Sequence, residues 1–219
     1  RLRKPVAVSG TDPADLMFPV VDEVTYGTGG RWGRWSDGGG STLELKDLRS
    51  DGRRAASWAD SDESGETGWV TIETTGQLVH GSGSPINRLH VMLLGAGECL
   101  VDDVEVIPAG SSNRILNGGF ESGTASWLMQ GTHEASSLES SGFSGRRSLH
   151  VRAAGRGDLA GNRITVPLTS ELATGMTATL RARVKWLRGH PEILLRLQGG
   201  TLEATGNILP PSLVPGTPG

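Results

Sequence analysis

The tryptophans are the first residues in this sequence whose type and spacing suggest a chemical role, namely stacking against a ligand. The chain has six tryptophans against one tyrosine, and a flat indole face can stack on the C–H surface of a sugar ring. Trp69 alternates with Thr71 and Glu73, and so falls on the polar face of its segment. Trp32 and Trp35 lie in the glycine-rich stretch GGRWGRWSDGGG. We predict all three as carbohydrate contacts; the alternative for the loop pair is that they plug the end of a β-sandwich.

Oxygen-rich side chains gather in a second segment, which reads DSDESGE from Asp60 onward. Asp60, Asp62 and Ser64 occupy positions one, three and five, and glycine stands at position six, as at the start of an EF-hand calcium loop. The bidentate glutamate expected at position twelve is missing, because Thr71 stands there. The segment therefore indicates either a calcium site with Asp60 and Asp62 as ligands or a solvated acidic loop.

Enzymatic chemistry has no motif in this sequence. G-x-S-x-G, H-E-x-x-H and a Walker loop are all missing, and the five histidines are scattered. Nothing selects two carboxylates as an acid and a nucleophile. We therefore predict that the protein is not an enzyme.

Two further side chains are expected to be structural, and two histidines are expected to be exposed. Trp186 shares an apolar strand face with Val184, so it is predicted in the core. Cys99 is the one cysteine, which makes an internal disulfide impossible and a buried, apolar role the expectation. His90 and His150 fall on the polar faces of their strands, so both are expected to be exposed.

The elements that position these residues are predicted from period-two alternation. Segments 177–187 (TATLRARVKWL), 192–198 (EILLRLQ) and 87–94 (NRLHVMLL) alternate apolar and polar side chains. No amphipathic helix of ten or more residues is found, and 33 glycines mark many turns. The pattern predicts an all-β protein of tandem antiparallel β-sandwich or jelly-roll domains, with one face of each sheet buried.

Length and composition limit the classes of partner. The 219 residues suffice for two small domains or one larger β domain. A formal charge of −3 argues against a nucleic-acid partner. No apolar run approaches the roughly 20 residues of a transmembrane helix, so no membrane span is expected. The terminal residues 210–219 are rich in proline and glycine and read as a linker.

The middle of the chain reads as the end of one domain and the start of another. Residues 99–107 (CLVDDVEVI) look like a closing strand, and ILNGGF then looks like an opening one. The predicted domains are therefore two sandwiches, residues 1–108 and 111–209. Asp102 alternates onto the apolar face of the closing strand, so its carboxylate must be paired, hydrogen-bonded or metal-bound.

Two stretches carry a resemblance to known families. NRILNGGFESGTASW (113–127) and CLVDDVEVI (99–107) resemble the opening and closing strands of carbohydrate-binding modules with a galactose-binding-like jelly roll. The order of the later motifs, Trp127, then SGFSGRRSLHVRA and GMTATLRARVKW, also follows that family. Residues 20–51 are similar to the closing strands of bacterial lamin-tail-like domains, and we expect them to be absorbed into the first sandwich.

The resemblance implies a structural Ca²⁺ in modules of this kind. Carried over, its ligands would be Glu121 for the second module and Asp102 or Asp103 for the first. Each module shows only half of the usual ligand pair, because the second lacks the paired aspartates and the first lacks the NGGFE opening. The alternative is an aspartate that caps loop amides. In the family Trp127 usually packs, so it is expected to be structural.

The function predicted at this point is non-catalytic carbohydrate binding, by a pair of modules from a large secreted or cell-surface bacterial protein. The expected partners are a polysaccharide or other glycan and further domains of the same chain. The alternative is a structural or adhesion spacer that binds no sugar, because this fold hosts both functions.

Overall fold

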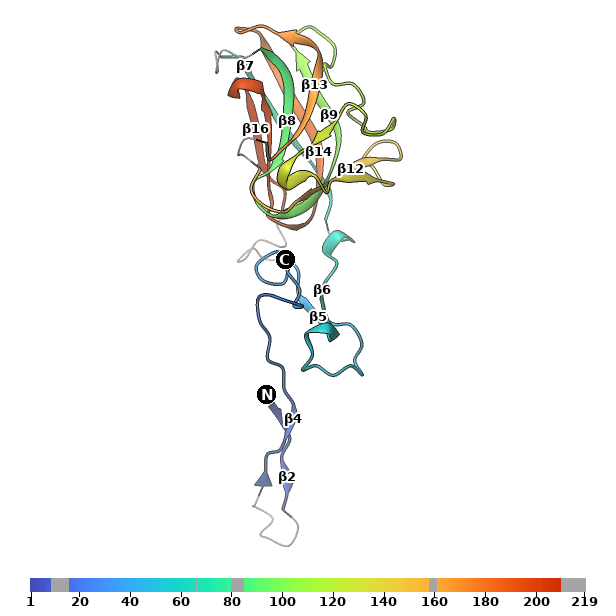
Figure 1. Ribbon diagram of the computed structural model, residues 1–219, viewed down its shortest axis with the longest axis vertical. Helices are drawn as coiled ribbons and strands as arrows, with labels where there is room; N and C mark the ends of the chain where they lie inside the picture. The colour runs from blue at the N-terminus through green and yellow to red at the C-terminus, as the bar shows by residue number, and fades with distance from the viewer. Residues whose placement is uncertain (9–15, 66, 80–84, 158–160, 210–219) are drawn as a thin grey trace. The chain divides into compact units, whose positions relative to one another are not determined.

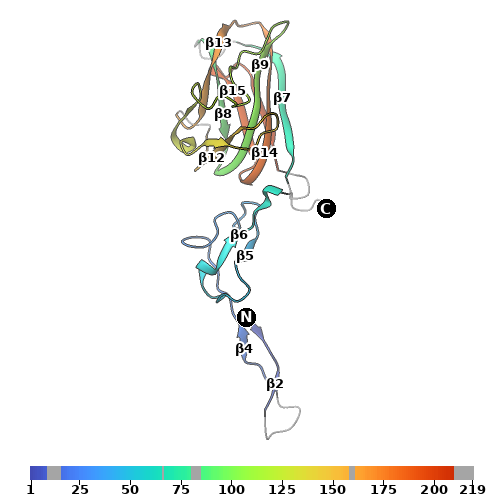
Figure 2. The ribbon, with the colours of Figure 1, turned by 90° about the vertical axis from the view of Figure 1, so that its right-hand side faces the viewer.

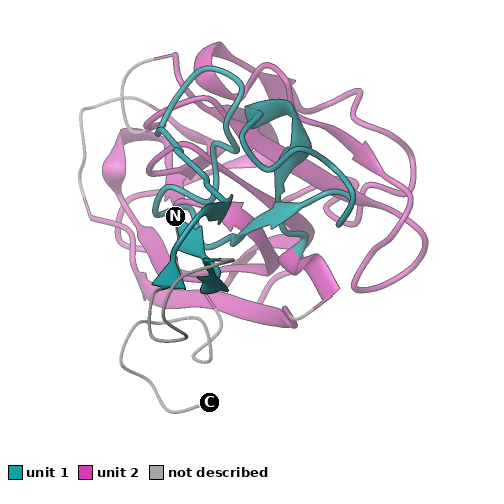
Figure 3. Ribbon diagram, turned by 90° about the horizontal axis from the view of Figure 1, so that it is seen from below, with its two compact units in different colours: residues 1–62 teal, residues 63–219 magenta. Residues whose placement is uncertain are grey.

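The protein is all-β in the computed structural model (Figure 1). The residues described are 1–8, 16–65, 67–79, 85–157 and 161–209. They form sixteen β-strands and four short 3-10 helices, and no α-helix occurs among them. Every strand pair is antiparallel, which confirms the predicted fold class. The chain divides into two compact units, residues 1–62 and 63–219, coloured separately in Figure 3.

The second unit is a β-sandwich of two five-stranded sheets (Figure 2). Its strands are β7 (Trp69–Gln77), β8 (Ile86–Leu93), β9 (Gly97–Pro108), β10 (Leu128–Met129), β11 (Ser137–Glu139), β12 (Ser148–Ala153), β13 (Ile164–Leu172), β14 (Thr177–Gly189), β15 (Glu192–Leu197) and β16 (Glu203–Asn207). The β8 sheet has the order β10-β13-β8-β15-β16, and the β9 sheet has the order β11-β12-β9-β14-β7. Three 3-10 helices lie between strands: η2 (Glu63–Gly65), η3 (Gly131–His133) and η4 (Gln198–Gly200).

The core of this sandwich follows the predicted alternation most clearly in β14. Its inward residues, Ala178, Leu180, Ala182, Val184 and Trp186, are all fully buried. Each large apolar side chain buried in this way stabilises the fold by about 1.5–3 kcal/mol. The indole nitrogen of Trp186 donates to the carbonyl oxygen of Gly189 at 3.1 Å, which satisfies its one polar atom. Trp186 is therefore the core residue that the sequence predicts.

Two further predicted core residues are also buried. Trp127 packs against Phe120, with ring centroids 4.7 Å apart, and both side chains belong to the hydrophobic core. Cys99 is fully buried in the same core. Burial raises the pKa of its thiol, so the side chain behaves as a small apolar group.

The predicted boundary between residues 108 and 111 is wrong. β9 pairs with β12 and with β14, and β8 pairs with β13 and β15, so strands from both sides of that point share each sheet. One hydrophobic core holds Val101 from before the boundary together with Leu149 from after it. Alternation reports which side chains point inward, but it does not identify the partner strand. The proposed sandwiches 1–108 and 111–209 are therefore replaced by one sandwich that begins near residue 63.

The first unit contains three two-stranded ribbons. β1 (Leu2–Arg3) pairs with β4 (Val20–Asp22), β2 (Val6–Ala7) with β3 (Leu16–Met17), and β5 (Leu43–Leu45) with β6 (Trp58–Asp60). η1 (Ala55–Ser57) precedes β6. Segment 20–51 lies wholly within this unit, so its expected absorption into a sandwich with strand 99–107 is also wrong. Among the described residues of the unit only Ser61 is buried, so these ribbons enclose no apolar core.

Two further predictions concern the end of the chain and a membrane span. The predicted linker, residues 210–219, lies outside the described residues. No helix in the described part of the chain is long and apolar enough to cross a membrane.

The two strand histidines differ from expectation. His90 and His150 are both buried, although each lies on the outer face of its sheet. His150 hydrogen-bonds through Nε2 to a carboxylate oxygen of Glu98 at 2.9 Å. Burial acts to raise the pKa of Glu98, but hydrogen bonds from His150 and Arg188 outweigh it and lower that pKa to about 2. Polar alternation predicted the correct face, but it could not predict how far neighbouring side chains cover that face.

Candidate functional site: a polar pocket beside an aromatic pair

A β-bulge in β9 creates the candidate site. Arg181 of β14 pairs with Glu105 and Arg183 pairs with Asp102, so Asp103 and Val104 together face a single residue of β14. Asp103 adopts a left-handed conformation, with φ of 46°, which a non-glycine residue seldom does. The extra residue shifts the alternation of the strand by one position at this point.

Because of this shift, the residues of β9 that point inward differ from those predicted. Cys99 and Val101 before the bulge, and Val104 and Val106 after it, all point into the core. Leu100 and Asp102 therefore lie on the other face. The sequence pattern predicts that they share a face with Val104, and this prediction is wrong. Two adjacent aspartates gave no sign of the bulge in the sequence, because alternation continues on both sides of it.

Asp102 is fully buried on that outer face, beneath residues 141–147, which we call the clamped loop. Its Oδ2 accepts the backbone N–H groups of Phe143 at 2.7 Å and Ser144 at 3.0 Å. Its Oδ1 accepts the N–H of Asp103 at 2.8 Å. Burial raises the pKa of the Asp102 carboxyl, and these three amide donors act in the opposite direction. The prediction that this carboxylate must have partners is confirmed.

Glu121 holds the other half of the clamped loop. Its Oε1 accepts the backbone N–H groups of Arg146 at 2.7 Å and Arg147 at 2.8 Å. Asp103 adds a third fixing point, because its carboxylate accepts the hydroxyl of Ser144 at 2.6 Å. The three carboxylates expected to bind calcium are therefore brought to one loop, where they accept protein hydrogen bonds.

This donor set does not fit a calcium site. Ca²⁺ needs six to eight oxygen ligands, whereas N–H groups, which present positive charge, surround the carboxylates of Asp102 and Glu121. No group of three or more His, Cys, Asp or Glu side chains placed to hold a metal occurs in the described ranges. The arrangement fits the alternative raised from sequence, in which the carboxylates cap loop amides.

Of the two predicted ligands in the acidic loop, Asp60 behaves similarly. Oδ1 of Asp60 accepts the backbone N–H groups of Trp35 at 3.1 Å and Ser36 at 2.8 Å. Asp60 thereby fixes the turn that carries the loop tryptophans. Asp62 is exposed.

The clamped loop places an aromatic side chain against the predicted sugar contact. Phe143 meets Trp69 edge to face, with ring centroids 5.9 Å apart and an interplanar angle of 65°. The guanidinium carbon of Arg183 lies 4.6 Å from the centroid of the Phe143 ring, which is cation–π geometry. Phe143 is nonetheless 46% exposed, and Trp69 is partly exposed. Sequence reasoning selected Trp69 and missed Phe143, although an apolar residue between Gly142 and Gly145 was a usable signal.

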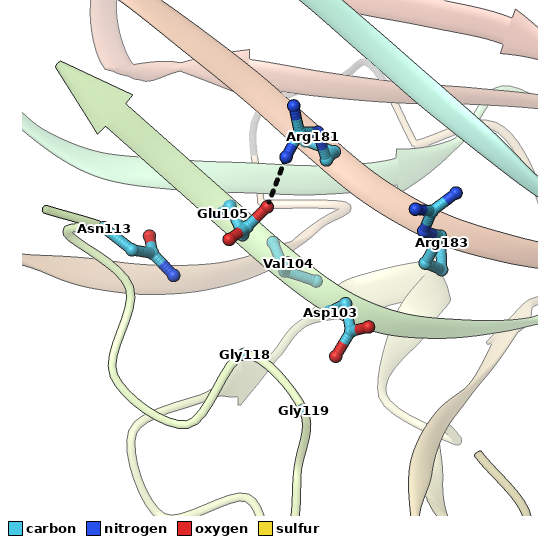
Figure 4. Close-up of a pocket in the computed structure, with 8 residues that line it drawn as sticks. All are labelled: Asp103, Val104, Glu105, Asn113, Gly118, Gly119, Arg181 and Arg183. Atoms are coloured by element: carbon cyan, nitrogen blue, oxygen red, sulfur yellow. Dashed lines mark hydrogen bonds and ion pairs between the residues drawn. The ribbon is translucent and has the colours of Figure 1, made fainter. Parts of the chain in front are cut away.

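A polar pocket of about 300 Å³ lies on the same outer face of the β9 sheet (Figure 4). It is lined by Asp103, Val104, Glu105, Asn113, Gly118, Gly119, Arg181 and Arg183. Two carboxylates and two guanidinium groups balance in formal charge. Oε2 of Glu105 lies 3.1 Å from Nη1 of Arg181, and Arg181 also forms an ion pair with Glu73 of β7.

Asn113 and the loop glycines shape the pocket wall. Oδ1 of Asn113 accepts the N–H groups of Val106 and Ile115, both at 2.9 Å, so its Nδ2 remains as a donor. The carbonyl oxygen of Gly118 accepts the N–H of Val104 at 3.0 Å. A Cβ on Gly118 would overlap the carbonyl oxygen of Val104, so only glycine allows this close approach. The pocket thus presents both donors and acceptors on a fixed frame.

The other two predicted sugar contacts belong to the first unit. Trp32 and Trp35 are both partly exposed, and the guanidinium of Arg34 lies 4.7 Å from the Trp35 ring centroid. A pocket of about 210 Å³ in this unit is lined by Tyr26, Gly27, Thr28, Gly33, Ser36, Asp37 and Leu43, and includes neither tryptophan. The residues that line the pocket of the sandwich do not include them.

Comparisons with protein-family models, curated proteins and solved structures gave no match for this chain. The class that the fold itself defines is an all-β protein whose larger unit is a two-sheet antiparallel sandwich.

Proposed function

We propose that the sandwich is a non-catalytic carbohydrate-binding module, and that its site is the pocket of the β9 sheet together with Trp69 and Phe143. The observation that carries the proposal is a solvent-accessible aromatic pair, Phe143 exposed and Trp69 partly exposed, beside a pocket of balanced charge on an open sheet face. Sugar rings present C–H faces that stack on aromatic rings and hydroxyl groups that need both donors and acceptors. The clamped loop supports binding because a site fixed in advance loses little entropy when the ligand binds.

The charges of the pocket favour binding over catalysis. The carboxylate of Glu105 is ion-paired with Arg181, and that of Asp103 accepts the Ser144 hydroxyl. Both carboxylates are therefore engaged in holding structure, and neither is arranged as a free proton donor. Equal numbers of carboxylate and guanidinium groups suit a neutral sugar. The proposed setting is a larger secreted or cell-surface protein.

A spacer or adhesion module is the second candidate. The observation in its favour is that Arg181 is already paired with both Glu73 and Glu105, so part of the polar capacity of the pocket is used within the protein. Such a module would hold other domains apart and bind no sugar.

Tryptophan fluorescence during titration with a panel of neutral glycans tests the choice. A binder should show saturable quenching or a shift in emission, and Trp69→Ala and Phe143→Ala should each weaken the affinity by about two- to tenfold, since an aromatic contact contributes about 0.5–1.5 kcal/mol. Leu128→Ala is the matched control, because this exposed apolar residue belongs to the other sheet. No response across a broad panel would favour the spacer.

A further inference from the structure

A second group of polar side chains lies on the outer face of the other sheet, opposite the proposed sugar site. Thr165 of β13 pairs with His90 of β8, and His90 pairs with Arg196 of β15, so the three form one row across three strands. Their sequence neighbours Leu89 and Ile164 point into the core. The row therefore faces outward, with side chains close enough to interact directly.

The row lies in a strongly basic environment. Burial first, and then the charges of Arg163, Arg196 and Arg88, lower the pKa of His90 to about 4. His90 is therefore neutral at pH 7. The ion pair that this group makes among the described residues joins Arg196 to Glu203 of β16 at 2.5 Å. Three guanidinium groups against one carboxylate leave a positive excess.

Two polar atoms in this group have no partner. Thr165 is only 4% exposed, and its hydroxyl oxygen is buried without a hydrogen bond. Nε of Arg163 is also buried without one. A buried donor left unsatisfied destabilises the fold, and more so when it is charged. Both atoms can donate, so an acceptor of negative charge would satisfy them and the positive excess together.

We propose that Arg88, Arg163, Thr165 and Arg196, which we call the arginine cluster, bind an oxyanion such as sulfate or a carboxylate. The Thr165 hydroxyl and Nε of Arg163 donate to it, and neutral His90 forms part of the floor. Guanidinium groups suit this role because their planar donors match the oxygens of sulfate and carboxylate. The cluster lies on the opposite sheet from the pocket, so this inference does not depend on the proposed sugar site.

Backbone amide shifts in NMR spectra at pH 7 provide the test. Sodium sulfate is titrated against sodium chloride at matched ionic strength. Saturable shifts at Thr165 and His90 with sulfate alone are expected. Thr165→Val, which keeps the shape of the side chain, should weaken sulfate binding by about tenfold or more, because it removes one hydrogen bond to a charged group. Equal shifts with both salts, or unchanged binding by Thr165→Val, would overturn the proposal.

A second readout separates a specific site from a general salt effect. A bound anion should raise the pKa of His90 by about one unit or more, because opposite charge favours the protonated form. His133 is the internal control, since burial alone lowers its pKa to about 4. If sulfate raises the two pKa values equally, the effect is general and the proposal fails. Parallel titrations with a sulfated and a neutral oligosaccharide show whether the anion is a sugar substituent or a free ion.

Discussion

Lowering the pH from 6.5 to 4.5 is expected to destabilise the sandwich by about 4 kcal/mol, through two buried histidines. His133 is fully buried; its Nε2 accepts the N–H of Leu93 at 3.0 Å, and its Nδ1 lies 3.1 Å from the Thr132 hydroxyl. Only a neutral imidazole can accept that N–H. The pKa values of His133 and His90 are both lowered from 6.5 to about 4.

The sign and the size follow from these values. Below pH 6.5 the unfolded chain binds protons that the folded protein does not, so stability falls as pH falls until about pH 4. Between pH 6.5 and 4.5 each histidine contributes a loss of about 2 kcal/mol. Glu98 acts in a lower window, because its folded pKa is lowered from 4.5 to about 2, and the stability that it contributes is lost only as pH falls below 4.5.

Urea unfolding at half-unit steps from pH 7.5 to 4.5, followed by circular dichroism, measures the slope. His133→Gln retains an acceptor for the N–H of Leu93 and does not titrate, so it should reduce the loss by about half, to about 2 kcal/mol. His90→Gln should do the same, and the double variant should show almost no slope. A wild-type stability that is flat over this range, or a double variant with the original slope, would refute the reasoning.

Four further outcomes are expected. Asp102→Ala should speed amide exchange in the clamped loop, residues 141–147, by about tenfold or more, because it removes a charged hydrogen-bond acceptor of two loop amides. Adding calcium and then a chelator should leave the melting midpoint of the wild-type protein unchanged. Gly118→Ala should cost about 2 kcal/mol or more in unfolding free energy, because the new Cβ would overlap a carbonyl of β9; Gly119→Ala, where the nearest atoms lie at 3.6 Å, is the near-neutral control. Glu98→Gln should flatten the acid limb of the stability curve below pH 4.5, as urea unfolding can show.

The sequence predicted local geometry well, because alternation records the environment of each side chain. β14 is the clearest case, with Trp186 in the core as expected. Pairing between strands is a different kind of information. Nothing in residues 99–107 specifies that their partners are β12 and β14, so the boundary at residue 110 was placed where two strands of one sandwich follow each other.

The candidate site was predictable to the same limited extent. Trp69 was found because it is an aromatic residue on the polar face of its strand, where it alternates with Thr71 and Glu73. The bulge at Asp103 was not, because a left-handed residue other than glycine leaves no compositional sign. Phe143 was missed because its position depends on distant carboxylates, Asp102 and Glu121, which fix its loop. The loss of exposure at His90 likewise depends on neighbours that are far away in sequence.

The pairing of β9 with β12 and β14 also bears on how the chain reaches its native state. Residues 97–108 must wait for partners that lie up to about 90 positions later, as in the pairing of Gly97 with Gly189. Closing such large loops costs conformational entropy before any stabilising contact forms, so folding should be slow and cooperative. A nick near Gly110 should therefore leave neither piece able to fold alone, yet the two pieces should reassemble into one sandwich when mixed.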